Sequence, residues 1–142
     1  MGTGRILWPM VRKSLLWFRI WTVRLAYAAA RVLPVKRRVV LATGNIPAIR
    51  GDLAAIREEI ARRDPTIPVV TLLHHARGGP IGRLIGIARG VEAGYHLATA
   101  ALFVVDSHYL PIYVIKRRPG TTVVQTWHAC GAIKKIGYSV LD

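Results

Sequence analysis

Cysteine is almost absent from the 142-residue sequence, and this absence excludes a disulfide-stabilised scaffold. Cys130 is the only cysteine, so no intramolecular disulfide can form. A lone cysteine fits a protein of a reducing compartment. Because Cys130 closely follows His128, a thiol nucleophile is one interpretation, and a small, half-buried filler side chain is the one that we favour.

Long uncharged runs are also missing, although 52% of the residues are hydrophobic. No uncharged stretch approaches the roughly 20 residues that a transmembrane helix needs. The amino-terminal segment has neither the apolar centre nor the small-residue cleavage site of a signal peptide. The complete glycine-rich fingerprint of a phosphate-binding loop is absent as well. The apolar content is sufficient for the core of one domain of this length.

Acidic residues are absent from residues 1–38, which contain nine arginines and lysines. The whole chain has a formal net charge of +14, and most of the excess lies in this segment. Such a balance suits an anionic membrane, a phosphorylated substrate or nucleic acid. No nucleic-acid recognition module is recognisable, so we do not expect nucleic acid as a partner.

Residues 6–33 have the pattern of a helix with two distinct sides, which Pro34 would end. On a helical wheel the basic residues fall within an arc of about 140°, and the opposite side carries no charge. We therefore predict that residues 1–38 form a basic amphipathic helix on an anionic membrane, with its tryptophans at the headgroup level. The alternative is a helix packed on the protein's own core with a solvated basic face. The basic residues are Arg12, Lys13, Arg19, Arg24 and Arg31, and the uncharged side comprises Trp17, Phe18, Trp21, Leu25, Ala28, Ala29, Val32 and Leu33.

From residue 39 onward, short β-branched runs alternate with helical patterns, which predicts an α/β fold. Asp52 is the expected N-cap of the first helix in this part, and glycines interrupt the second. Residues 39–142 therefore predict a Rossmann-like parallel sheet of about four strands. The expected strands are residues 39–43, 69–73, 101–105 and 121–126, and the expected helices are residues 52–63, 83–99 and 110–117.

Small or polar residues follow each expected strand. Right-handed crossovers place the carboxyl ends of parallel strands on one edge of a sheet, where open α/β sheets bind ligands. The residues gathered at this edge would be Gly44-Asn45, His74-His75, Asp106-Ser107-His108 and Trp127-His128.

Several of these residues have a structural interpretation beside the functional one. The pair Gly44-Asn45 forms a turn or lines the cleft. Adjacent histidines on a strand end, such as His74-His75, point to opposite faces, which argues against a metal site. Asp106 either caps the following helix or orients His128 as its carboxylate partner.

The segment that follows the last expected strand carries the most chemistry. A neutral imidazole such as that of His128 would remove a proton from a hydroxyl, because an ordinary histidine pKa of about 6.5 is close to working pH. Gly131 would let a ligand approach the backbone, and Lys134 and Lys135, on the first turn of an expected helix, would attract an anion. By residue types alone, a strand, a tight turn and a solvated basic helix start account for the same pattern.

Gln125-Thr126-Trp127-His128, followed by Gly131 and Lys134-Lys135, resembles the Gln-x-Trp-His…Gly…Lys signature of the CDP-glycerol glycerophosphotransferase family, the teichoic-acid primases and polymerases. Within that family, residues 127–138 are similar to the form Trp-His-Ala-x-Gly-Ala-Phe-Lys-Lys-Phe-Gly. The similarity covers about a dozen positions. Upstream, residues 39–125 are similar to the family only in the order of their elements.

The resemblance implies an activity and a set of site residues. The family's enzymes are peripheral membrane proteins with two Rossmann-like halves of the GT-B type. They transfer a polyol phosphate from a CDP-activated donor to a lipid-linked acceptor hydroxyl in teichoic-acid synthesis. CDP-glycerol is the expected donor substrate, and no cofactor or metal is expected. The resemblance makes His128 the catalytic base and Trp127, Gly131, Lys134 and Lys135 substrate-binding residues, although Trp127 would also serve to pack the loop.

The resemblance also implies that residues 39–142 are the N-terminal, acceptor-side half of such an enzyme, without the C-terminal donor half. The expected partners are then an anionic membrane surface, a lipid-linked phosphorylated acceptor, and either a donor-binding half or a second copy of the chain. The expected location is the cytoplasmic face of the cell membrane, as a peripheral protein. The alternative function is a non-catalytic half, truncated or split, that docks at the membrane or binds the acceptor only.

Overall fold

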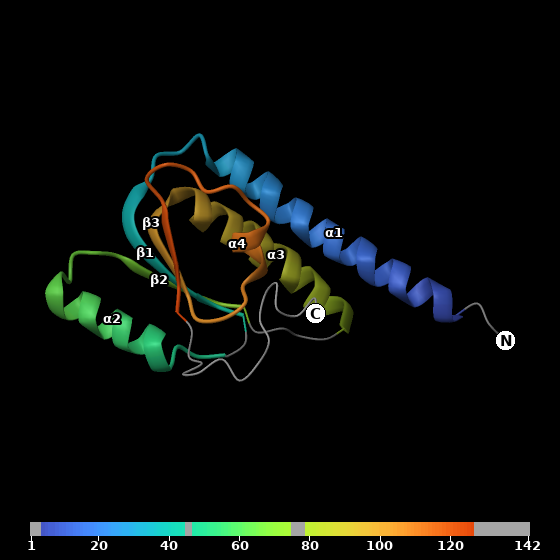
Figure 1. Ribbon diagram of the computed structural model, residues 1–142, viewed down its shortest axis with the longest axis horizontal. Coiled ribbons are helices and arrows are strands. Elements are labelled where there is room, and N and C mark those ends of the chain that lie inside the picture. Colours follow the sequence, from blue (N-terminus) through green and yellow to red (C-terminus); the bar gives the residue numbers. More distant parts are fainter. Residues whose placement is uncertain (1–3, 45–46, 75–78, 127–142) are drawn as a thin grey trace, which may run out of the picture.

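A computed structural model of the chain describes residues 4–44, 47–74 and 79–126, and it has the predicted α/β fold (Figure 1). Every predicted strand is present, and the four strands form one parallel sheet. The expectations for residues 127–142 lie outside the described residues. In chain order the elements are α1 (Gly4–Ala30), β1 (Lys36–Thr43), α2 (Gly51–Arg63), β2 (Val69–Leu73), α3 (Gly79–Thr99), β3 (Ala100–Val105), α4 (Leu110–Tyr113) and β4 (Thr122–Gln125).

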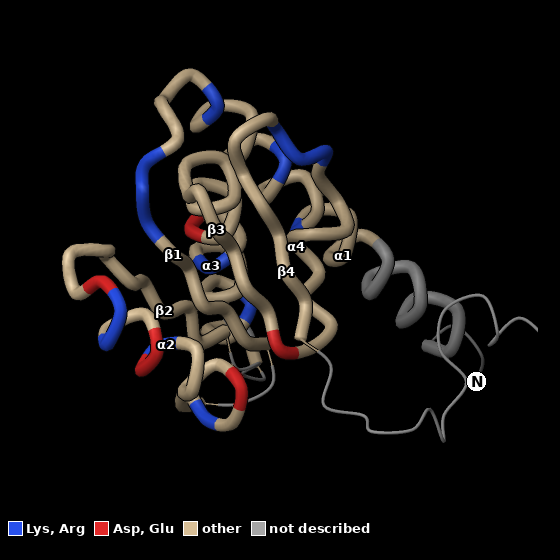
Figure 2. The backbone as a smooth tube through the Cα atoms, turned by 60° about the vertical axis from the view of Figure 1, so that its left-hand side comes forward, with Lys and Arg blue, Asp and Glu red and all other residues tan. Residues whose placement is uncertain are grey.

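The strand order in the sheet is β2-β1-β3-β4, so the direction of winding reverses beside β1. Val40 of β1 lies opposite Val70 of β2 on one side and opposite Phe103 of β3 on the other. Since all neighbouring strands are parallel, their carboxyl ends share one edge, as predicted. The basic start of β1 lies at the opposite edge (Figure 2). In an open α/β sheet the crevice for a ligand lies where the winding reverses, here at the ends of β1 and β3.

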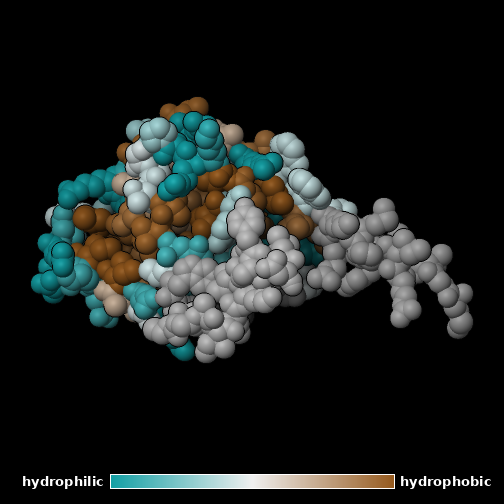
Figure 3. All heavy atoms as spheres, in the orientation of Figure 1, coloured by the Kyte–Doolittle hydropathy of each residue, from teal (hydrophilic) through white to brown (hydrophobic). Residues whose placement is uncertain are grey.

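Both faces of the sheet are covered by helices, which explains the nearly continuous apolar runs of its strands. Successive side chains of a strand point to opposite faces. Leu41 therefore packs toward α2, against the buried Leu53. Val40 points to the other face, where it joins Phe103 and Leu97 of α3 in the larger core cluster. Figure 3 shows a band of apolar side chains across the middle of one face of the molecule.

Helices α1 and α3 run side by side in the same direction, and glycines of α3 allow their close approach (Figure 1). A Cβ atom on Gly94 would lie 2.6 Å from the backbone oxygen of Val23, and one on Gly90 would lie 3.1 Å from Oγ1 of Thr22. The prediction that glycines interrupt this helix is wrong, because α3 is continuous from Gly79 to Thr99. The glycines instead form the line along which α1 packs.

Helix α1 is joined to the core by a line of residues that the helical wheel did not single out. Val23, Tyr27 and Ala30 are buried, and Tyr27 and Ala30 belong to the larger core cluster. The tryptophans Trp17 and Trp21 are 58% and 52% exposed. The helix thus packs on the protein's own core and still leaves aromatic side chains in contact with solvent. Within the described ranges no helix has the length and apolar character to span a bilayer.

The segment after α4 fixes the ends of α1 and α3. Nη1 of Arg118 donates to the carbonyl oxygens of Arg31, Leu33 and Ala98, at 3.0, 2.8 and 3.1 Å. The last carbonyls of a helix have no partner within it, and an arginine is a suitable donor for them. The Tyr27 hydroxyl donates to the carbonyl of Lys116 at 2.7 Å. One extended segment therefore binds the carboxyl-terminal ends of both helices.

Several predicted boundaries are wrong, and tertiary contacts explain the clearest case. The expected helix at residues 110–117 ends at Tyr113, because the carbonyls of Val114 and Lys116 accept hydrogen bonds from Arg24 and Tyr27 of α1. Asp52 does not cap α2, whose N-cap is Arg50 without a side-chain hydrogen bond. Helix α1 ends at Ala30 rather than at residue 33, and α3 begins at Gly79 rather than at residue 83.

Candidate functional site at the carboxyl edge of the sheet

The residues predicted to act on substrate all lie outside the described part of the chain. They are the expected base His128 and the expected substrate-binding residues Trp127, Gly131, Lys134 and Lys135. What the structure describes is the edge of the sheet toward which β4 leads, and the cavity beside it.

Gln125 fixes the end of β4 to the loop that follows β3. Its Nε2 donates to the carbonyl oxygen of Ser107 at 3.2 Å, and its Oε1 accepts from the Tyr113 hydroxyl at 3.0 Å. The backbone nitrogen of Thr126 donates to the carbonyl of Val105 at 2.8 Å. Three hydrogen bonds therefore determine where the chain leaves the sheet, immediately before Trp127.

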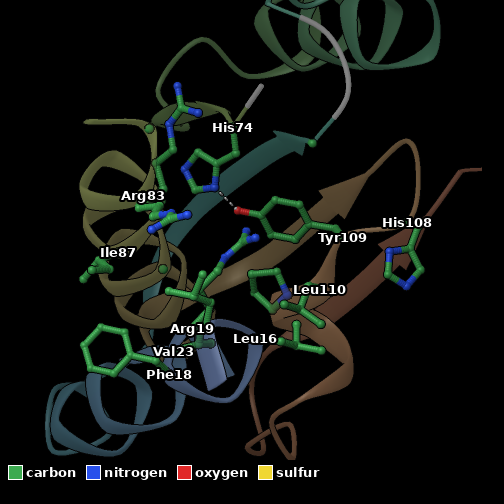
Figure 4. Close-up of a pocket in the computed structure, with 17 residues that line it drawn as sticks. Leu16, Phe18, Arg19, Val23, His74, Arg83, Ile87, His108, Tyr109 and Leu110 are labelled. Carbon is green, nitrogen blue, oxygen red and sulfur yellow. Dashed lines mark hydrogen bonds between the residues drawn. The ribbon is translucent and has the colours of Figure 1, made fainter. Parts of the chain in front are cut away.

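A cavity of about 500 Å³ lies at this edge, between the sheet, α1, α3 and the start of α4 (Figure 4). Gly44 after β1, His74 after β2, and His108 and Tyr109 after β3 all line it. Three of the four predicted strand-end clusters are thus brought together. Of the two interpretations of Gly44, the structure supports the one in which it lines the cleft.

His74, Tyr109 and Glu92 form a hydrogen-bonded chain in the wall of the cavity. Nδ1 of His74 lies 2.8 Å from the Tyr109 hydroxyl, and Nε2 lies 3.2 Å from Oε2 of Glu92. A neutral imidazole donates through one nitrogen and accepts through the other. Since a carboxylate only accepts, Nε2–H donates to Glu92 and Nδ1 accepts from the Tyr109 O–H. Both ring nitrogens of His74 are therefore occupied.

Burial keeps both members of the histidine–tyrosine pair neutral. Loss of solvent lowers the pKa of His74, an effect that the neighbouring Glu92 carboxylate opposes and the charges of Arg89 and Arg19 reinforce. Loss of solvent likewise raises the pKa of Tyr109 above its usual range. The hydrogen bond to neutral His74 therefore holds the Tyr109 hydroxyl in one orientation in the cavity wall.

The rest of the polar lining is cationic. Arg19 of α1 and Arg83 and Arg89 of α3 line the cavity, and Figure 4 shows Arg19, His74 and Tyr109 around the same space. Within residues 4–44, 47–74 and 79–126, neither Arg19 nor Arg83 has an ion-pair partner. Guanidinium groups without a carboxylate partner attract phosphate. The arrangement is thus suited to hold an anion.

Two further polar residues, Asp106 and His96, have contacts that account for them without a substrate. The interpretation of Asp106 as the cap of the next helix is wrong, because the N-cap of α4 is Tyr109, and Asp106 accepts instead from Oγ of Ser107 at 2.9 Å. Its alternative role as a partner of His128 stays a prediction, because His128 lies outside the described residues. His96 of α3 is buried, and burial together with the charge of Arg38 lowers its pKa.

Comparison with known proteins connects this edge to a family. A family model described as CDP-Glycerol:Poly(glycerophosphate) glycerophosphotransferase matches residues 25–142, which include the whole sheet and the segment after it. The chain belongs to this family. The resemblance drawn from residues 125–138 is thereby confirmed, and the described sheet edge and cavity are features of a member of the glycerophosphotransferase family.

Three proteins that are similar to this member of the glycerophosphotransferase family have names that refer to teichoic acid. The teichoic acid ribitol-phosphate primase of Bacillus spizizenii is 34% identical over 112 residues, which are 78% of this chain and 28% of the primase. The teichoic acid poly(ribitol-phosphate) polymerase of the same species is 30% identical over 115 residues, 80% of this chain and 18% of the polymerase. A teichoic acid ribitol-phosphate polymerase of Staphylococcus aureus is 40% identical over 45 residues, 32% of this chain and 9% of that polymerase. The chain spans less than a third of the length of each.

The network of His74, Glu92 and Tyr109 could not be found from spacing alone. The hydrogen-bonded pairs are 18 and 35 residues apart in the sequence, so no local motif contains them. The one available signal was that His74 and Tyr109 both follow parallel strands, whose ends meet at one edge. Glu92 reaches the site from the middle of α3, for which the sequence offered no signal.

Proposed function

We propose that this chain is the acceptor-side part of a transferase that moves a polyol phosphate from a CDP-activated donor to a membrane-bound acceptor hydroxyl in teichoic-acid-type polymer synthesis. The observation that carries the proposal is the family match over residues 25–142. The position of β4 adds support, since its carboxyl end lies at the edge of the sheet where ligands bind and Trp127-His128 follow it closely in the sequence.

In the proposed reaction, His128 removes the proton of the acceptor hydroxyl, and that oxygen attacks the β-phosphorus of the donor. A new phosphorus–oxygen bond forms, the bond between the β-phosphorus and the bridging oxygen breaks, and CMP leaves. Lys134 and Lys135 would balance the negative charge that develops, and Gly131 and Trp127 would hold the substrate. Glycerol phosphate is the unit that we propose, and the names of the matched relatives specify ribitol phosphate.

A GT-B arrangement would require a second half that binds the donor nucleotide, supplied by another segment or by a second copy of the chain. We place the protein at the cytoplasmic face of the membrane. Support comes from α1, whose exposed Trp17, Trp21 and Leu25 lie within the segment of residues 1–38 that has no acidic residue. The alternative is a non-catalytic half that docks at the membrane or binds the acceptor only.

The first prediction tests the base. His128→Ala should reduce CMP release at least about a thousandfold, because the acceptor hydroxyl loses its proton acceptor. Release is measured with CDP-glycerol and with CDP-ribitol, for the chain alone and for the chain joined to the carboxyl-terminal remainder of the Bacillus spizizenii primase. Activity confined to the joined protein would support the non-catalytic half as the role of this chain by itself.

Cys130→Ala is the matched control for that experiment. It removes the only thiol beside the motif, and it should leave CMP release within about twofold of the unsubstituted protein. Loss of activity in Cys130→Ala with retention in His128→Ala would replace the base mechanism by a thiol nucleophile. Equal activity of all three proteins would remove His128 from the reaction.

A further inference from the structure

We propose that His108 is a specificity-determining residue, whose imidazole hydrogen-bonds a hydroxyl group of the polyol unit and thereby sets which polyol phosphate is accepted. That this contact selects the transferred unit rests on the proposed function. The contact itself, between the imidazole and the hydroxyls of a polyol phosphate, can be tested on the chain alone.

His108 lies at the part of the sheet edge where a ligand is expected. It follows the end of β3 by three residues and lines the cavity beside the point where the winding of the sheet reverses. Its side chain is exposed, and among the described residues neither of its ring nitrogens has a hydrogen-bond partner. Both nitrogens are therefore available to a ligand.

The ring of His108 is held in one orientation although it is exposed. It stacks on the ring of Tyr113, with the two centroids 4.9 Å apart and the two planes inclined by 16°. Tyr113 is the last residue of α4, and its hydroxyl donates to Oε1 of Gln125 at 3.0 Å. Nε2 of Gln125 donates in turn to the carbonyl of Ser107, the residue before His108. An imidazole supported in this way loses little conformational freedom when a ligand binds, so more of the energy of its hydrogen bond contributes to affinity.

The charges around His108 favour a hydroxyl over a phosphate. Arg19 and Arg83 line another part of the cavity, and Figure 4 shows the Tyr109 ring between them and His108. The strand end that carries His108 also carries the carboxylate of Asp106, which no ion pair neutralises within the part of the chain that the structure describes. A carboxylate repels a phosphate, whereas an imidazole both donates to and accepts from a hydroxyl. This end of the cavity therefore suits the uncharged, hydroxyl-bearing part of a polyol phosphate.

Recognition of hydroxyls at a fixed place distinguishes one polyol from another. Glycerol and ribitol carry the same functional group and differ in chain length and in the number and position of their hydroxyls. A site that hydrogen-bonds a substrate hydroxyl discriminates against a substrate that lacks it. The imidazole of His108 would thus select the polyol whose hydroxyl falls within its reach.

Nuclear magnetic resonance of the full chain tests the contact. The Cε1–Hε1 signal of His108, assigned by its absence from His108→Phe, is followed at constant pH during titration with glycerol 3-phosphate, ribitol 5-phosphate or propyl phosphate. Propyl phosphate is the matched probe, because it has the carbon skeleton of glycerol phosphate without the hydroxyls. The signal should shift to saturation with at least one polyol phosphate and stay unchanged with propyl phosphate. Equal shifts with all three probes, or no shift with any of them, would overturn the contact.

Substitutions separate the hydrogen bond from the stacking. His108→Phe keeps an aromatic ring on Tyr113 and removes both nitrogens, so it should weaken binding of the preferred polyol phosphate about five- to tenfold and leave that of propyl phosphate unchanged. Tyr113→Leu keeps the imidazole without its support and should have a smaller effect. Arg57→Gln, an exposed residue of α2, is the control and should bind like the unsubstituted chain. Saturation-transfer spectra of the ligands measure binding, and unchanged affinity in a His108→Phe protein that thermal melting shows to be folded would remove His108 from the site.

The chain joined to the carboxyl-terminal remainder of the primase gives a second readout, the ratio of kcat/KM for CDP-glycerol to that for CDP-ribitol. His108→Phe should shift this ratio at least about fivefold toward the poorer donor, whereas loss of a merely structural residue would lower both values by a similar factor. An unchanged ratio would overturn the specificity role. Failure of the proposed function is distinct from these results. A joined protein that releases no CMP, while His108 responds to a polyol phosphate and not to propyl phosphate, retains the polyol contact and loses the transferase role.

Discussion

At the residue scale, Gln125 connects the described structure to the motif that follows it. Its side-chain amide bridges the Ser107 carbonyl and the Tyr113 hydroxyl, three residues before His128 in the sequence. Both partners are neutral, so each hydrogen bond contributes about 1 kcal/mol to stability. Under the proposed function, we expect these bonds to matter more for the transfer reaction than for folding.

If the proposed function is right, Gln125→Ala should lower kcat for polyol-phosphate transfer about tenfold or more and change KM little, since the proposed base His128 would be displaced while the cavity stays intact. Steady-state kinetics of the joined protein measures both constants. Tyr113→Phe removes only one of the two side-chain hydrogen bonds and should have a smaller effect on kcat. A loss of thermal stability in Gln125→Ala without a change in kcat would show that Gln125 is only a structural residue.

Two histidines make the stability of the fold depend on pH. Burial lowers the pKa of His74 and of His96 in the folded state. Between those lowered values and the unfolded value of about 6.5, the unfolded chain binds more protons, so acidification favours unfolding. The stabilisation is complete above about pH 6.5 and is lost as pH falls through the folded pKa values. The urea midpoint should be lower at pH 5.0 than at pH 7.5.

Replacing the histidines should remove part of this dependence. His74→Gln and His96→Gln should each reduce the difference between the two urea midpoints, because a glutamine side chain does not titrate. The carboxylates of Glu59 and Asp64 contribute at lower pH, because hydrogen bonds from Arg62 and Thr66 respectively lower their pKa values from 4.5 and 3.8. A midpoint that stays constant between pH 7.5 and 5.0 would contradict the assignment to His74 and His96.

At the element scale, the contact of α1 with α3 holds the amino-terminal helix on the fold. Gly94 lies against the backbone of α1, whereas a Cβ on Gly86 would come no closer than 4.0 Å to Nε of Arg19. The two glycines therefore differ in what a methyl group would meet, although both are inside the same helix. This difference provides a matched pair of substitutions.

Gly94→Ala should lower the free energy of unfolding by about 1–3 kcal/mol, because the added Cβ would lie 2.6 Å from the Val23 carbonyl oxygen and the helices would have to move apart. Gly86→Ala should be neutral or stabilise by up to about 1 kcal/mol, since alanine favours a helix over glycine. Urea unfolding measures both. Equal stability of the two variants would mean that the close approach of α1 to α3 does not contribute to the fold.

At the scale of the whole molecule, the excess of positive charge and the exposed tryptophans both lie in the amino-terminal segment. Residues 1–38 contain no acidic residue, and α1 exposes Trp17 and Trp21 while its other side packs on α3. We propose that α1 lies in a bilayer interface, where a helix binds through apolar insertion and through attraction to anionic lipid. Both contributions are open to measurement.

The chain should float with vesicles that contain phosphatidylglycerol and should float less with neutral vesicles or at high salt, because salt screens the attraction. Trp17→Ser/Trp21→Ser should reduce flotation several-fold. Val124→Ser is the control, since it removes an exposed apolar side chain from β4 rather than from α1. A chain that floats with neither type of vesicle and shifts DNA in a gel would reverse the choice of membrane over nucleic acid.

The alternation of apolar runs and helical patterns in the sequence determined the α/β class, the four strands and the shared edge of their carboxyl ends. The strands and helices follow from the local periodicity of apolar residues, which can be read directly from the sequence. The shared edge follows from the right-handed crossovers that such a sheet almost always has. The motif from Gln125 to Lys135 likewise identified the family, because its residues are adjacent in sequence.

Only the tertiary structure decided how α1 is used and which residues share the cavity. The wheel separated a basic from an aromatic side of α1, but the residues that pack are Val23, Tyr27 and Ala30, since the shape of α3 along its glycines selects them. Arg19, His74 and Tyr109 meet because three elements, distant in sequence, end at one place. Packing between distant elements depends on the shapes of both surfaces at once, so a pattern within one short stretch of sequence cannot predict it.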